Sequence, residues 1–154
     1  MVGVVFYLED IDNRLNMEMI DQIAFNARML GATHLFMIDK TRFKTGQYYQ
    51  HSDANIEYHY YQDFNIFMSD FGMNTFIFLE NDASFASLGL EYQNIDVFTH
   101  PSDCIYIFGP DSRVESILDY KRLQNEMYVN IHNVENMYAH AAIIITLYDR
   151  KIKE

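Results

Sequence analysis

The sequence predicts an α/β domain built on a mostly parallel sheet with helices on both faces. Short apolar runs, typical of strands buried on both sides, alternate with segments that carry the three-and-four spacing of a helix. Such alternation is typical of parallel strands joined by crossover helices. The chain has 154 residues but only two prolines and six glycines, which leaves little room for linkers. We therefore expect residues 1–154 to form a single domain.

The first quarter of the chain predicts a strand, a helix and a second strand. Residues 2–8, "VGVVFYL", form a continuous apolar run and predict the first strand. Apolar residues then recur at mixed three- and four-residue spacing over residues 16–30, which predicts a helix that Gly31 ends. The second strand is expected at residues 33–39, "THLFMID".

The middle of the chain is less regular. Residues 41–55 are polar and predict a loop, and residues 56–62, "IEYHYYQ", fit either a short strand or an aromatic loop. Asp63 is a suitable N-cap for a helix that runs to Gly72. Residues 74–80, "NTFIFLE", then predict a strand.

The remainder of the chain predicts two further strands and two further helices. Residues 81–98 are irregular and contain one short helix. A strand at 103–109 and a helix at 110–120 follow. A last strand is expected at 126–132 and a long helix at 135–154, whose basic residues in the final turns favour the helix dipole.

Charge and composition limit the classes of partner. The net charge is −11, from 22 acidic and 11 basic residues, and opposes non-specific attraction to nucleic acid, so no DNA partner is expected. One basic segment stands apart: Lys40, Arg42 and Lys44 surround Phe43. This segment is either a solvated loop or an RNA-binding site, at which the cations contact phosphates and the ring stacks on a base.

The location is predicted from what the sequence lacks. No apolar stretch is long enough for a transmembrane helix, and the amino terminus has no basic region or cleavage site of a signal peptide. Cys104, the single cysteine, cannot form an internal disulfide, and its apolar neighbours predict a buried, inert thiol. We expect a cytoplasmic protein without a membrane partner.

The common nucleotide and catalytic loops are missing. The sequence contains no GxGxxG after the first strand, no GxxxxGK[ST] and no GxSxG. No metal site is expected, because none of the six histidines has HExxH or another recognisable ligand spacing. These are His34, His51, His59, His100, His132 and His140.

The stretch "CIYIFGPDSR" predicts a strand that ends in a tight turn before a helix. Gly109 permits a backbone conformation and a close approach that a Cβ would obstruct. Pro110 suits the first helical position, and Asp111 favours the positive end of the helix. In open α/β sheets ligands bind at the carboxyl ends of the strands, so this turn is either a ligand loop or a simple connection.

Four segments in order carry a resemblance to a known family. The segments "FIFLENDASFASLGL", "YIFGPD", "YVNIH" and "NMYAHAAIIITLYDR" follow a helix and strand ending in "ARMLGATHLFMID". Together they resemble the SpoU/TrmH branch of the SPOUT methyltransferases, and most of all the minimal, single-domain tRNA ribose methyltransferases. The resemblance spans nearly the whole chain. It implies a deep trefoil knot near the carboxyl terminus, a homodimer, and methyl transfer from S-adenosylmethionine to ribose 2′-hydroxyls of tRNA or rRNA.

The resemblance also implies a cofactor site made of three loops. The family's Phe-Gly-x-Glu is matched by Phe108, Gly109, Pro110 and Asp111, although Val114 replaces a second loop glycine. Ile131, the hydrophobic residue at the end of the next strand, matches a further cofactor contact. Leu79 and Glu80 match contacts at the end of the preceding strand, and Asn136 and Met137 match contacts at the entry to the final helix. His132 stands where the family usually has proline.

The expected catalytic arginine is absent from its family position, which Phe25 occupies here. Arg28, three residues later, and Arg14, before the helix, are the candidate replacements. Tyr138 occupies the position of a motif asparagine, so Asn136 and Tyr138 complete the candidate catalytic set.

Two other functions remain open. A catalytically degenerate protein of the same fold would bind a nucleotide-like ligand, RNA or a protein partner, and the lost arginine and the acidic charge favour it. The retained "FGPD" and the basic segment favour the enzyme. A flavodoxin-like signalling domain, with Asp39 as phosphoacceptor, is the third possibility, but no suitably placed lysine late in the chain is evident.

Overall fold

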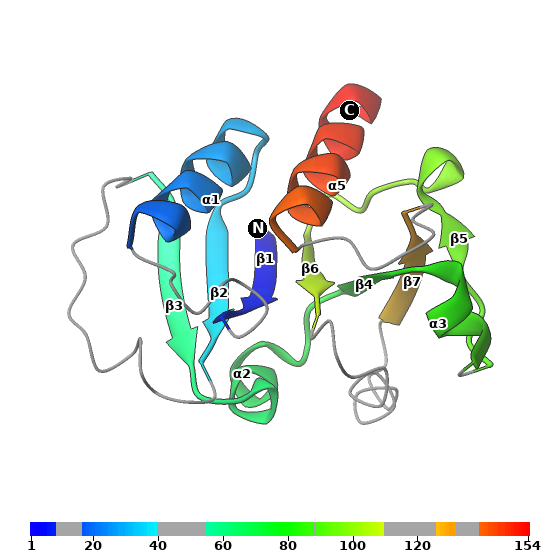
Figure 1. The fold of residues 1–154 in the computed structure, drawn as a ribbon, viewed down its shortest axis with the longest axis horizontal. Coiled ribbons are helices and arrows are strands. Elements are labelled where there is room, and N and C mark those ends of the chain that lie inside the picture. Colours follow the sequence, from blue (N-terminus) through cyan, green and yellow to red (C-terminus); the bar gives the residue numbers. More distant parts are fainter. Residues whose placement is uncertain (9–16, 40–54, 88, 110–125, 132–138) are drawn as a thin grey trace.

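The centre of the protein is a sheet of seven parallel strands (Figure 1). The computed structural model describes residues 1–8, 17–39, 55–87, 89–109, 126–131 and 139–154. Across the sheet the strands stand in the order β3-β2-β1-β6-β4-β7-β5. Their bounds are β1 Val2–Tyr7, β2 His34–Ile38, β3 Glu57–Tyr61, β4 Phe76–Glu80, β5 Gln93–Asn94, β6 Cys104–Phe108 and β7 Glu126–Asn130.

Helices cover both faces of the sheet, as predicted. On one face α1 (Met17–Met29) and α5 (Ala139–Lys153) lie side by side over a core of aliphatic and aromatic side chains (Figure 1). On the other face α2 (Phe64–Phe71) packs on a second core that is rich in phenylalanine. Successive strand residues alternate between these two cores because side chains along a strand point to opposite faces. A short helix, α3 (Asp82–Ser87), follows β4.

Two predicted helix boundaries have the expected local causes. Asp63 caps α2, because its carboxylate accepts a hydrogen bond of 2.8 Å from the backbone N–H of Ile66. Gly31 ends α1 with a φ of 99°, a left-handed conformation that glycine adopts without strain. The N–H of Ala32 reaches back to the carbonyl of Ala27 at 2.9 Å, which closes the end of the helix.

The structure decides two regions that the sequence left open or missed. Residues 57–61 form a strand, β3, rather than an aromatic loop, and they pair with β2 along their whole length. Residues 81–98 contain α3, the two-residue strand β5 and a 3₁₀ turn at Ile95–Val97. The sequence missed β5 because Gln93 and Asn94 are exposed and have no apolar pattern. The predicted loop at 41–55 and helix at 110–120 lie outside the described residues, apart from Asn55.

Late strands are inserted between earlier ones. Strand β6 lies between β1 and β4, and β7 lies between β4 and β5. The ends of β4, β6 and β7 are therefore neighbours although they are far apart in the sequence. The connections after β6 and β7, residues 110–125 and 132–138, lie outside the described residues, so the knot stays a prediction.

None of the helices in the described ranges is long and apolar enough to cross a membrane. The predicted burial of Cys104 is confirmed, and burial raises the pKa of its thiol.

Candidate ligand site at the carboxyl edge of the sheet

Three predicted cofactor segments meet at one edge of the sheet. In the strand register Leu79 of β4 pairs with Phe108 of β6 on one side and with Val129 of β7 on the other. Adjacent strands lie about 4.8 Å apart, so the next residues, Glu80 and Gly109, stand close together at the carboxyl edge. The structure thus brings together, at this edge, the predicted cofactor residues that fall within its described ranges.

Backbone groups, rather than apolar side chains, are what these strand ends offer to a ligand. The side chains of Leu79, Phe108 and Ile131 are buried in the core beneath α1 and α5. A parallel strand leaves N–H and C=O groups at its carboxyl end, and these groups need partners.

Gly109 makes the turn that ends β6. Its φ is 87°, in the left-handed region that other residues adopt only with strain. This confirms the turn that the sequence predicted after Phe108. Gly109 directly follows the point where β4 and β6 end together.

Buried asparagines at the same edge were not singled out from the sequence. Asn130, the last residue of β7, pairs with Glu80 in the register and donates a hydrogen bond of 2.9 Å to Oδ1 of Asn94 in β5. Asn81, which follows β4, is also buried. The sequence feature that could have identified them is an amide side chain at the end of an apolar strand, in "FLEN" and "YVNI". They give this edge a polar lining beside the Glu80 carboxylate.

Arg28 lies at the opposite edge of the sheet. It occupies the last turn of α1, and the chain then reaches Thr33, whose N–H donates to the carbonyl of Val2 at the start of β1. The Arg28 guanidinium carbon lies 5.5 Å from the centre of the Phe25 ring, which is 52% exposed. Arg28 follows Phe25 by three residues, and α1 runs toward the amino edge of the sheet. Within one chain the structure therefore does not bring Arg28 to Gly109.

The other predicted site residues lie outside the described residues, and their roles remain predictions. They are Arg14, Lys40, Arg42, Lys44, Pro110, Asp111, Asn136, Met137 and Tyr138.

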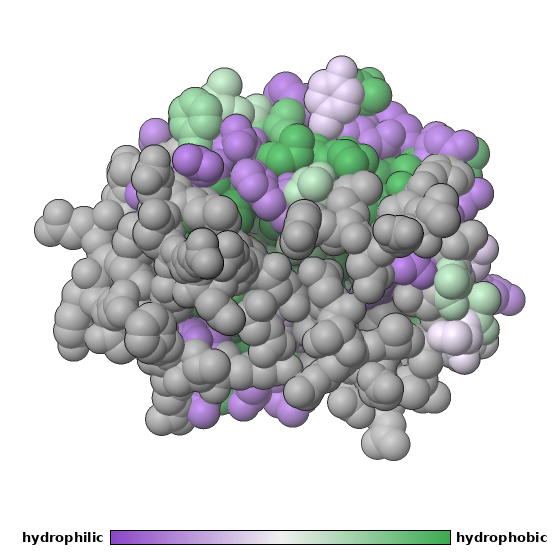
Figure 2. Space-filling view, viewed as in Figure 1, coloured by the Kyte–Doolittle hydropathy of each residue, from purple (hydrophilic) through white to green (hydrophobic). Residues whose placement is uncertain are grey.

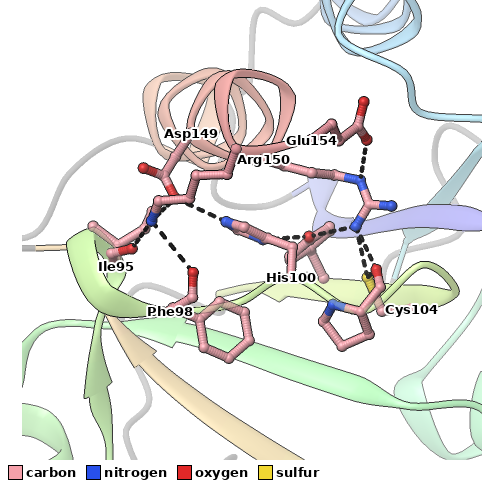
Figure 3. A network of polar contacts seen from close by, with 10 residues as sticks. Ile95, Phe98, His100, Cys104, Asp149, Arg150 and Glu154 are labelled. Atoms are coloured by element: carbon pink, nitrogen blue, oxygen red, sulfur yellow. Dashed lines mark hydrogen bonds and ion pairs between the residues drawn. The ribbon is translucent and has the colours of Figure 1, made fainter.

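A second polar cluster joins the end of α5 to the segment before β6 (Figure 3). His100 lies between the carboxylate of Asp149, 2.8 Å from its Nε2, and the hydroxyl of Tyr106, 2.6 Å from its Nδ1. Burial lowers the pKa of His100 and raises that of Tyr106. A cavity of about 510 Å³ adjoins the cluster, lined by Asp96, Val97, Phe98, Thr99, His100, Ser102, Arg150, Lys153 and Glu154. Because the polar groups bond to one another, we interpret this cluster as structural.

By sequence the chain matches no family model and no curated protein. It is similar in structure to a protein from Porphyromonas gingivalis assigned to the TrmH family of RNA methyltransferases. The TM-score is 0.61 at 12% identity, over 99% of this chain and 60% of that one. A structure concerned with the 2-OH methylation of C/U34 on tRNA gives a TM-score of 0.63 at 16% identity, over 99% and 90%. An RNA 2′-O ribose methyltransferase gives 0.62 at 7% identity, over 99% and 56%.

The length of the match differs between these proteins. The chain spans 60% of the Porphyromonas protein and 90% of the protein associated with tRNA. The structural match extends over 99% of this chain at low sequence identity, and it establishes a common architecture. The chain has the fold of the TrmH-type, or SPOUT, RNA methyltransferases.

Proposed function

We propose that the protein is an S-adenosylmethionine-dependent RNA 2′-O-ribose methyltransferase, with tRNA as its substrate. The observation that carries the proposal is the meeting of the β4, β6 and β7 ends at one edge of the sheet, in the fold of RNA methyltransferases. The near full-length match to the tRNA-associated structure supports tRNA over rRNA.

The cofactor site is proposed to hold adenosine mainly through the backbone. Strand-end N–H and C=O groups at Leu79, Gly109 and Ile131 suit the edge of an adenine ring, and a carboxylate such as Glu80 suits ribose hydroxyls. S-adenosylmethionine supplies an activated methyl group on its sulfonium. The chain must orient the RNA hydroxyl toward that group and stabilise the charge that develops on its oxygen. We assign Pro110, Asp111, Asn136 and Met137 to the rest of this site.

A guanidinium is the group best suited to stabilise that charge, and Phe25 cannot supply one. Arg14 precedes α1 and follows the carboxyl end of β1, so it is the stronger candidate for the same chain. Arg28 would act only on the site of a second copy, because it lies at the amino edge of its own sheet. Asn136 and Tyr138 are proposed to position the RNA hydroxyl beside the cofactor.

The RNA is proposed to contact the segment after β2. Lys40, Arg42 and Lys44 follow the carboxyl end of that strand in the sequence. The net charge of −11 repels phosphates, so RNA binding would depend on a local cluster of positive charge such as this segment.

We infer a homodimer that pairs through α1 and α5. Phe25 and Met29 on α1, with Ile145, Tyr148 and Ile152 on α5, are exposed. The two helices contact one another, and Figure 2 shows apolar surface along the side of the molecule where Figure 1 places them. Exposed apolar residues on adjacent helices are typical of a surface that a partner covers.

A non-catalytic protein of the same fold is the second candidate function. The phenylalanine at the arginine position favours it, because an exposed aromatic ring cannot replace a cation in catalysis. Such a protein would bind a nucleotide-like ligand at the same edge of the sheet without methyl transfer.

The test is calorimetric titration of the purified protein with S-adenosylmethionine. The wild type is expected to bind one cofactor per chain, and Gly109→Ala to weaken binding at least about tenfold, because the added Cβ strains the turn. Gly31→Ala is the matched control: its φ of 99° imposes similar strain, but it lies at the amino edge with no atom within 4 Å of the new Cβ.

Three outcomes would change the assignment. Equal affinity in Gly109→Ala and the wild type would remove Gly109 from the cofactor site. Tight binding without methyl transfer to tRNA would favour the non-catalytic function. Retained methyl transfer in Arg14→Ala would exclude Arg14 as the catalytic cation.

A further inference from the structure

Two imidazoles and a carboxylate converge at the amino end of β2 and β3, away from the proposed cofactor site. Glu57 stands opposite His34 in the strand register, and His59 lies two residues further along β3, on the same face of the sheet. The Nε2 atom of His34 lies 3.1 Å from Oε2 of Glu57, and Nε2 of His59 lies 3.3 Å from the same oxygen. The three side chains therefore aim their donor atoms at one point.

The spacing of these atoms suits a metal ion. Zinc binds imidazole nitrogen and carboxylate oxygen at about 2.0–2.2 Å, so two ligands of a tetrahedral site lie about 3.3 Å apart. The two nitrogen–oxygen distances match this value, and the donor atoms all lie within 4.8 Å of one another. Two histidines and one glutamate also form a known three-residue zinc set that leaves a position for water.

Aromatic packing holds the imidazole rings in place. The rings of His34 and His59 are nearly parallel, at an interplanar angle of 9°. Phe36 stacks on both, with its ring centre 5.9 Å from His34 and 5.0 Å from His59. Phe71 of α2 meets His59 edge-on at 6.2 Å. Ligand rings that are already oriented by packing lose less freedom when a metal binds.

Thr33 contacts the second ring nitrogen of His34. Its Oγ1 lies 2.7 Å from Nδ1 of His34 and 3.2 Å from the carbonyl oxygen of Val2. In the tautomer in which Nδ1 carries the proton and donates to Oγ1, the hydroxyl donates to that carbonyl and the Nε2 atom presents its lone pair toward Glu57. A hydrogen bond to the second ring nitrogen is how proteins commonly orient a histidine ligand.

The charges at this point call for a cation. The Nε2 atom of His34 and a carboxylate oxygen of Glu57 lie 3.1 Å apart, a contact in which a proton or a metal ion must lie between the two atoms. The Glu57 side chain is 67% exposed, which leaves the site open to ions and water.

We propose that His34, Glu57 and His59 form a binding site for a divalent transition metal, zinc in particular. The sequence predicted no metal site because the ligands lie on two strands and only the parallel register unites them. Among the described strands, β3 is at the edge of the sheet and pairs with β2 alone. The bound ion joins the first residue of β2 to β3 and so secures this edge strand.

The experiment is a zinc titration of the full chain after dialysis against a chelator. We expect one zinc ion per chain by calorimetry, and visible absorption bands of tetrahedral cobalt when Co²⁺ is used instead. Glu57→Gln and His59→Gln are each expected to weaken zinc binding by about 10-fold or more, and to abolish the cobalt bands. His140→Gln, which removes a half-buried histidine on α5, is the matched control and should bind as the wild type does.

Thermal unfolding gives an independent measurement. Zinc should raise the melting temperature of the wild type and of His140→Gln but not of Glu57→Gln, because only a folded site gains from the ion. Glu57→Gln replaces an exposed side chain and keeps its shape, so this variant is expected to fold. Zinc affinity in the wild type no higher than in the Glu57→Gln/His59→Gln double variant would overturn the proposal, as would the absence of tetrahedral cobalt bands in the wild type.

Discussion

Arg150 shows how one side chain fixes the end of α5 to the sheet. Its Nη1 donates to the carbonyl of Pro101 at 2.6 Å and to the Tyr106 hydroxyl at 3.2 Å (Figure 3). Its Nη2 donates to the carbonyl of Ser102 at 3.0 Å. Its Nε pairs with Glu154 at 3.2 Å. The guanidinium is buried, so these bonds replace the water that a cation would otherwise bind.

Arg150→Met is expected to lower the free energy of unfolding by about 3 kcal/mol. The variant keeps the apolar volume of the stem but leaves two carbonyl groups and a hydroxyl without their donor. Urea unfolding measures the change. Lys151→Met, at an exposed neighbouring position, is the control and should change stability by less than about 0.5 kcal/mol. Equal stabilities of the two variants would show that the buried bonds contribute little.

At the scale of elements, the contact between α5 and the segment before β6 depends on a neutral histidine. Burial lowers the pKa of His100, and the Asp149 carboxylate only partly opposes this effect. In the unfolded chain the imidazole recovers a pKa near 6.5. Below that pH the unfolded chain binds a proton that the folded one excludes, so acid favours unfolding. The pKa values of His34 and His140 are lowered by burial in the same direction.

We therefore expect the stability to become constant about one pH unit above 6.5, and to fall as the pH decreases through 6.5. His100→Gln should be less stable than the wild type at neutral pH, because it loses the bond to Asp149, but its stability should fall less steeply with acid. Urea unfolding at a series of pH values between about 7 and 5 measures the slope. A slope that is unchanged in His100→Gln would mean that other groups cause the acid effect.

At the scale of the whole molecule, the proposed dimer rests on the face formed by α1 and α5. The exposed apolar residues lie at i and i+4 on α1 and at i, i+3 and i+7 on α5, so each set forms a stripe along one helix. The inner stripes of the same helices are buried on the sheet. Both helices are thus apolar on two sides, which is typical of helices between a core and a partner.

Sedimentation is expected to show a dimer at micromolar concentration, and Tyr148→Glu to shift it toward monomer. A carboxylate in the centre of an apolar contact would be desolvated without a partner. Met73→Glu is the matched control, because Met73 is a highly exposed apolar residue outside this face. It should leave the dimer intact. A wild-type protein that sediments as a monomer would exclude the dimer.

The local elements could be predicted because their causes are local. The apolar run of β1, the spacing along α1, the cap at Asp63 and the turn at Gly109 each lie within a few residues of sequence. Strand β5 was missed because its pairing with β7, rather than its own composition, makes it a strand. The position of Arg28 could not be predicted, because it depends on the direction of α1 relative to the sheet. Residue spacing along a helix does not give that direction.

By itself the sequence determined the alternation of strands and helices, the two buried faces of the sheet and the turn at Gly109, because periodicity and backbone preference act over short distances. The tertiary structure alone decided the strand order and the register. That order places the ends of β4, β6 and β7 at one edge, and that register unites His34, Glu57 and His59 at the other. The physical reason is that pairing between strands depends on contacts across the whole chain, which no short segment specifies.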